Sequence, residues 1–202
     1  MYHRSIVRSI IHYKINIVVK ILILSDFFIY SASQLIAPIF AIFIIDNVTG
    51  AGLKEIGIAT ALFLIAKSIC EIPIGLYIDK SKTEKDDLYT ALIGTALMSL
   101  IYIAYIFIKE IWQLYLLQTL LGIAFAISYP GWVSIFSKHI DKGKEATEWS
   151  MYDVMLGVGT AATSALGGFI AVSFGFATLF VIVSVTSFIG SILLFLVRKN
   201  IK

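Results

Sequence analysis

The sequence predicts an all-α integral membrane protein with six transmembrane helices, arranged as two inverted three-helix repeats. Of its 202 residues, 59% are hydrophobic and 14% are charged, whereas soluble domains carry about 25% charged residues. The mean hydropathy is +0.92. Six apolar runs each reach the length of about 20 residues that crosses a bilayer as a helix.

The chain divides into a basic N-terminal segment at 1–20, a helical bundle at 21–197 and a basic tail at 198–202. In the N-terminal segment, basic residues alternate with isoleucine and valine, which is typical of a helix that lies on the inner membrane surface. A frayed basic tail is the alternative interpretation. Within the bundle the spans are expected at 21–45, 56–78, 88–108, 111–136, 149–173 and 176–197.

The positions of the basic residues predict the orientation. Most of the 16 lysines and arginines fall in the N-terminal segment, in the loops after the second and fourth spans, and in the C-terminal tail. The loops on the other side hold only Lys54 and Lys109. Because short cytoplasmic loops carry the excess of basic residues, both termini are expected in the cytoplasm, in a plasma (inner) membrane of bacterial type.

Polar side chains inside the spans are the candidates for function. An ionisable group within hydrocarbon is costly, so it is expected to face a partner, a cavity or a pathway rather than lipid. Spans one and four each add an amide side chain and a proline, a combination found where transporters line a midplane cavity. The candidates for solute or proton binding are Asp26, Gln34, Lys67, Glu71, Gln118 and Asp153.

Span two carries a polar stripe. Lys67, Glu71, Gly75 and Asp79 recur every four residues and therefore lie along one side of a helix. Lys67 and Glu71 can form an i,i+4 ion pair, so they either neutralise each other inside the bundle or take part in transport. The sequence leaves both interpretations open.

Span five carries small residues in two rows. The glycines at 157, 159, 167 and 168 allow another helix to approach closely, which is how helices associate where lipid supplies no hydrophobic drive. Spans three and six hold only scattered polar residues and are expected to be peripheral supports. Spans one and four, two and five, and three and six thus form similar pairs, and this layout predicts the inverted repeat.

Several kinds of function are not expected. The histidines His3, His12 and His139 all lie outside the spans, and no G-x-S-x-G occurs, so an intramembrane protease has no base or nucleophile. Neither C-x-x-C nor H-E-x-x-H is present, so no metal site and no cofactor are expected. Basic residues are not interleaved with exposed aromatics, which argues against nucleic-acid binding.

The loop after span two resembles a motif of the major facilitator superfamily, with the pattern G-x-x-x-D-(R/K). Gly75, Asp79 and Lys80 match it, while Lys82 stands where a glycine is usual. In span four, Gln118 and Gly122 stand where many members have R-x-x-x-G. From span one to span six, the chain resembles the N-terminal half of such a transporter.

This resemblance implies a secondary transporter of a small solute, in some members with proton coupling. It also implies that Gly75, Asp79, Lys80 and Lys82 form a conformational motif that contacts the other half of a twelve-span fold. A single half cannot alternate access. Either the sequence is a truncated piece of a longer transporter, or two copies (a homodimer), or this chain and a separate second six-span half, are expected to assemble. The alternative is a six-span membrane protein that binds a partner and transports nothing. The sequence does not predict the substrate.

Overall fold

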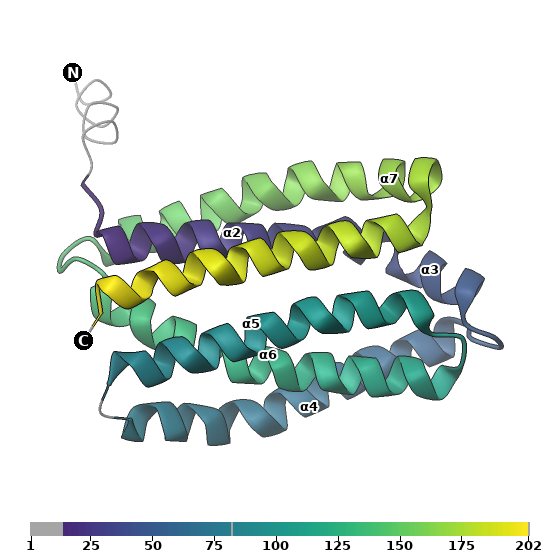
Figure 1. Ribbon diagram of the computed structural model, residues 1–202, viewed down its shortest axis with the longest axis horizontal. Coiled ribbons are helices and arrows are strands. Elements are labelled where there is room, and N and C mark those ends of the chain that lie inside the picture. The colour runs from purple at the N-terminus through teal and green to yellow at the C-terminus, as the bar shows by residue number, and fades with distance from the viewer. Residues whose placement is uncertain (1–13, 82, 202) are drawn as a thin grey trace.

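The computed structural model describes residues 14–81 and 83–201, and this part of the chain contains helices and no strand (Figure 1). Most of the predicted N-terminal segment, residues 1–13, lies outside the described residues, as does Lys82. The elements are α2 (Ile17–Ile36), η1 (Ala37–Ile39), α3 (Phe40–Asn47), α4 (Leu53–Lys80), α5 (Glu84–Ala104), η2 (Tyr105–Phe107), α6 (Ile111–His139), α7 (Glu145–Phe195) and η3 (Leu196–Lys199).

Five helical stretches are long and apolar enough to cross a membrane. They are Ile17–Asn47, Leu53–Lys80, Glu84–Phe107, Ile111–His139 and Glu145–Lys199. The predicted all-helical membrane class is therefore confirmed.

The last stretch contains a reversal of the chain. Gly175, inside α7, has φ 82° and ψ 162°, a left-handed backbone conformation that favours glycine. The chain turns back there, so residues 145–174 and 176–195 are two legs of opposite direction (Figure 1). This turn lies at the predicted break after Phe174.

Local hydrogen bonds fix where several helices begin. The Asn16 side chain accepts a hydrogen bond from the Val18 amide at 2.9 Å and caps α2. The Glu55 carboxylate accepts one from the Gly52 amide at 2.9 Å at the start of α4. Pro38, which lacks an amide hydrogen, lies in the short 3-10 segment between α2 and α3 and interrupts the first stretch.

The helices form two layers (Figure 1). One layer holds α2 and both legs of α7, and the other holds α4, α5 and α6; the closest packing is between α2 and α7, between α4 and α6, and between α5 and α6. Hydrogen bonds join α5 to the second leg of α7 across the layers. Thr95 Oγ1 donates to Ser191 Oγ at 3.0 Å, and Ser184 Oγ donates to the Ser99 carbonyl oxygen at 2.7 Å.

Basic residues gather at one end of the bundle. The start of α2, the end of η3, and the connections at 80–84 and 139–145 all lie there (Figure 1). We call it the basic end, because its lysines include Lys20, Lys80, Lys85, Lys138, Lys142 and Lys199. An aromatic cluster of Trp132, Phe136, Trp149 and Tyr152 fills the bundle near this end.

Candidate functional site

Two adjoining cavities lie between the layers. The first, the Asp26 cavity, measures about 100 Å³ and is lined by Asp26, Ile29, Tyr30, Ser33, Thr95, Met98, Tyr102, Phe125, Ser128, Tyr129, Trp132 and Tyr152. The second, the Lys67 cavity, measures about 460 Å³ and is lined by Tyr30, Ser33, Gln34, Ile36, Ala37, Phe40, Thr60, Phe63, Lys67, Tyr102, Tyr105, Gln118, Leu121, Phe125 and Phe180. Because four residues line both, the cavities are neighbours with a shared wall.

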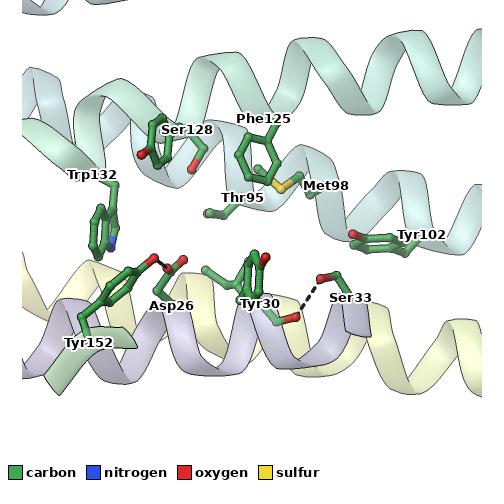
Figure 2. A pocket seen from close by; sticks show the side chains of 12 residues that line it. Asp26, Tyr30, Ser33, Thr95, Met98, Tyr102, Phe125, Ser128, Trp132 and Tyr152 are labelled. Carbon is green, nitrogen blue, oxygen red and sulfur yellow. Dashed lines mark hydrogen bonds between the residues drawn. The ribbon is translucent and has the colours of Figure 1, made fainter. Parts of the chain in front are cut away.

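The Asp26 carboxylate belongs to a polar contact between two helices. Tyr152 on the first leg of α7 donates a hydrogen bond of 2.6 Å to Asp26 Oδ2 on α2, and both side chains point toward the cavity (Figure 2). Trp132, which is 5% exposed, packs on the Tyr152 ring with 5.0 Å between ring centres. Its indole Nε1 is buried with no hydrogen-bond partner among the described residues. The smaller cavity thus has one acid, and its volume suits water molecules rather than an organic solute.

The larger cavity is lined by three of the predicted residues, Gln34, Lys67 and Gln118. Lys67 Nζ lies 3.9 Å from Glu71 Oε2, so the i,i+4 pair forms. The same ammonium lies 4.8 Å from the ring centre of Phe125 and 5.5 Å from that of Tyr129, within the range of cation–π attraction. Lys67 therefore both pairs with Glu71 and lines the cavity.

The remaining predicted polar residues lie elsewhere. Asp153 is exposed and lines neither cavity. In the predicted loop motif, Gly75 is half-buried, while Asp79 and Lys80 are exposed at the basic end. The structure therefore separates two of the predicted acids: Asp26 lines a cavity, and Asp153 does not.

The glycines of the first leg of α7 also divide. Gly159 lies against Ser31 and Phe27, and Gly167 lies against the Leu35 backbone, all on α2. A side chain at Gly157 or Gly168 would meet nothing within 4 Å. Two of the four glycines thus pack inside the bundle, and two do not.

Sequence reasoning missed the aromatic side chains of the cavities, such as Tyr105, Trp132 and Tyr152. Tyrosine and tryptophan inside a span are typical of packing, so composition gives no signal for them. For Tyr152 a signal existed: it precedes Gly159 by seven residues, which is two helical turns, and therefore shares the face of that glycine. Asp87 was also missed. It is fully buried and accepts hydrogen bonds from Ser134 at 2.7 Å and Lys138 at 2.8 Å, which join α5 to α6 at the basic end.

Comparison with known protein families identifies the chain. Residues 22–202 match the model of the Major Facilitator Superfamily. The chain belongs to this superfamily. The match supports a transporter of this superfamily, and the long apolar helices support an integral membrane protein. A search of curated proteins finds no match. The predicted family is confirmed on a match that begins five residues after α2 begins and includes every later helix.

Proposed function

We propose that the protein transports a small solute through the Lys67 cavity as one six-span half of a major facilitator transporter. The observation that carries this proposal is a cavity of about 460 Å³ lined by Gln34, Lys67 and Gln118 within helices long enough to cross a membrane. Polar groups of this kind are costly inside a bilayer and are retained where they serve a pathway.

Counting the two legs of α7 separately gives six spans, with Gly175 at the turn between the fifth and sixth. The excess of lysine at the basic end supports an orientation with that end, and both termini, in the cytoplasm. A plasma membrane of bacterial type is part of the same proposal. The exposed motif residues Asp79 and Lys80 would then lie at the cytoplasmic surface.

The packing of the helices supports an inverted repeat. An inverted repeat relates span one to span four, span two to span five, and span three to span six. If the related spans are exchanged, the contact between spans one and five becomes the contact between spans four and two. The same exchange converts the contact of one with six into that of four with three. Both members of each pair are present, seen for example at Gly167 with Leu35, Gly122 with Phe63, and Ser25 with Gly190. Spans three and six also contact each other, and the exchange leaves this pair unchanged.

We propose that a homodimer supplies the other six spans of the transporter, with a separate six-span half as the alternative partner. The support is the large uncovered surface of α4: of all the residues in this helix, only Ala59 and Ile78 are buried. The exposed side of the first leg of α7, with Gly157 and Asp153, is the second part of this surface. Gly75, Asp79, Lys80 and Lys82 are proposed to contact the partner.

Proton coupling belongs to the same proposal, with Asp26 as the proton-binding carboxyl. Asp26 supports this because it lines a water-sized cavity beside the Lys67 cavity. Gln118 stands where many relatives have an arginine, so a route through that position is not available to this chain.

Solute analysis tests the transport proposal. Cells that make the protein, its Asp26→Asn variant or no protein are compared by untargeted mass spectrometry of the cell contents and the medium. We expect at least one solute to change with the wild type and to return to the background level with Asp26→Asn. Asp46→Asn is the matched control, since Asp46 is exposed on α3, and it should behave as wild type.

Equal amounts of each variant in the membrane are required for this comparison. If the wild-type protein is present and no solute changes, transport is wrong, and a non-transporting partner protein becomes the better explanation.

A further inference from the structure

The Lys67 cavity carries one kind of charge. Among the described residues that line it, Lys67 is the one charged side chain, and none is Asp or Glu. Glu71, its ion-pair partner, is not part of the lining. A solute inside this cavity therefore meets a cation without meeting a carboxylate.

The Lys67 ammonium keeps its hydrogen-bonding capacity. Its contact with Glu71, at 3.9 Å between Nζ and Oε2, is longer than the 2.7–3.2 Å of an N–H···O hydrogen bond. The rings of Phe125 and Tyr129 attract the ammonium but accept no conventional hydrogen bond. Within the described residues no acceptor is in hydrogen-bond contact with Lys67, so an acidic group of a solute can supply one.

Other polar side chains line the same cavity. Tyr105 lines the cavity with part of its ring, but the residue is 1% exposed and its hydroxyl oxygen is buried with no hydrogen-bond partner within the described chain. Gln118 is 8% exposed, and its amide makes no hydrogen bond to the described residues. The Gln118 amide lines the cavity and is not among the buried unpaired atoms, so it can donate a hydrogen bond to a ligand with acceptor atoms.

The rest of the wall is aromatic and aliphatic. Phe40, Phe63, Phe125, Phe180 and Leu121 line it, and ligand cavities are typically apolar with a few polar groups that fix orientation. The volume of about 460 Å³ falls within the roughly 300–1,000 Å³ of small-molecule sites. Such a wall suits a flat apolar body.

From these observations we propose that the cavity binds an organic anion, in which one acidic group pairs with Lys67 and a flat apolar body lies against the phenylalanines. This inference names the solute class for the proposed transport function and rests on it. Glu71 acts from outside the lining as a partial counter-charge that keeps Lys67 in place when the cavity is empty.

Binding to matched probes tests the solute class. Benzoate, benzyl alcohol and benzylamine share one ring and differ in charge, and each is titrated into the purified full chain in detergent by calorimetry. We expect benzoate, and the longer phenylacetate, to bind at least about tenfold more tightly than the neutral and cationic probes. Equal or tighter binding of benzylamine, or no binding of either anion, would overturn the proposal.

Charge variants locate the binding. Lys67→Gln should weaken benzoate binding at least about tenfold. Lys54 is an exposed lysine near the start of the same helix, and Lys54→Gln should leave the affinity for benzoate unchanged. Glu71→Gln should strengthen benzoate binding several-fold, because it removes the negative charge near Lys67. A loss of folding cannot produce tighter binding, so this variant keeps the test decisive. Unchanged affinity in both Lys67→Gln and Glu71→Gln would overturn the assignment to this cavity.

The result separates this inference from the transport proposal. Lys67-dependent benzoate binding without any flux in cells would support the site and contradict transport. Flux of a solute without anion binding would support transport and contradict the solute class.

Discussion

The first leg of α7, residues 145–174, presents two faces that differ although their residues alternate closely in the sequence. The inner row, which faces the bundle, consists of Tyr152, Gly159, Thr163 and Gly167; the outer row, which faces away from it, consists of Asp153, Gly157, Ala161 and Gly168. Inner-row residues contact α2, through the Tyr152 hydrogen bond and the two glycines. Outer-row glycines have open space where a side chain would go. Small residues alone therefore do not tell whether a row is already packed.

The difference follows from helix geometry. Each residue turns the helix by about 100°, so Tyr152 and Asp153, or Gly167 and Gly168, point toward different surroundings. The inner row packs the first leg of α7 against α2, and the outer row is the proposed contact with a second half. This contrast gives neighbouring residues as matched controls for each other.

The largest effect is expected from comparing valine substitutions at the two adjacent glycines, Gly167 and Gly168. In Gly167→Val the new Cβ would collide with the Leu35 carbonyl oxygen, a backbone atom that moves only if α2 shifts. We expect a loss of about 3 kcal/mol in the free energy of unfolding, seen as a lower melting temperature in detergent. A Cβ at Gly168 meets nothing within 4 Å, and valine forms helix slightly better than glycine, so Gly168→Val should change the free energy of unfolding by less than about 1 kcal/mol. Equal melting temperatures would remove the distinction between the rows.

The sequence predicted the two rows but not which one faces α2. Periodicity places residues on a face, whereas the identity of the neighbour depends on how six helices assemble. The same limit applies to the acids: Asp26 and Asp153 are both acids within predicted spans, yet Asp26 is hydrogen-bonded to Tyr152 and Asp153 is exposed. Span positions were predictable because apolar length is a local property. The burial of Asp87, in the first turn of α5, was not predictable. It depends on a contact with Lys138 on a different helix.

An intermediate effect is expected from cysteine crosslinking between copies. Gly157→Cys on the outer row and Gly75→Cys on α4 should form a disulfide between neighbouring chains if a homodimer supplies the second half. Thr163→Cys on the inner row is the control for the same partner, because the Thr163 side chain bonds to its own helix, at the Gly159 carbonyl oxygen. We expect about tenfold more crosslinked dimer with Gly157→Cys than with Thr163→Cys, measured in native membranes on non-reducing gels.

Two other outcomes of the crosslinking would change the proposal. Equal crosslinking from both rows would mean that the outer row is not a specific contact. No crosslinking from either row, together with a copurifying second six-span chain, would replace the homodimer by a separate half.

The smallest expected effect is the difference between two coupling free energies, that of Tyr152 with Asp26 and that of Tyr152 with Asp153. In a double-mutant cycle, Tyr152→Phe and Asp26→Asn should interact by about 1 kcal/mol, as for other hydrogen bonds inside membrane proteins, because the first removes the donor of the 2.6 Å bond and the second replaces its carboxylate acceptor by a neutral amide. Tyr152→Phe and Asp153→Asn, adjacent in sequence, should add to within about 0.5 kcal/mol. Unfolding free energies of the five variants and the wild type in detergent give both values. If the coupling energy of Tyr152 with Asp153 were as large as that with Asp26, the position of a residue on the helix face would not decide which acid Tyr152 interacts with.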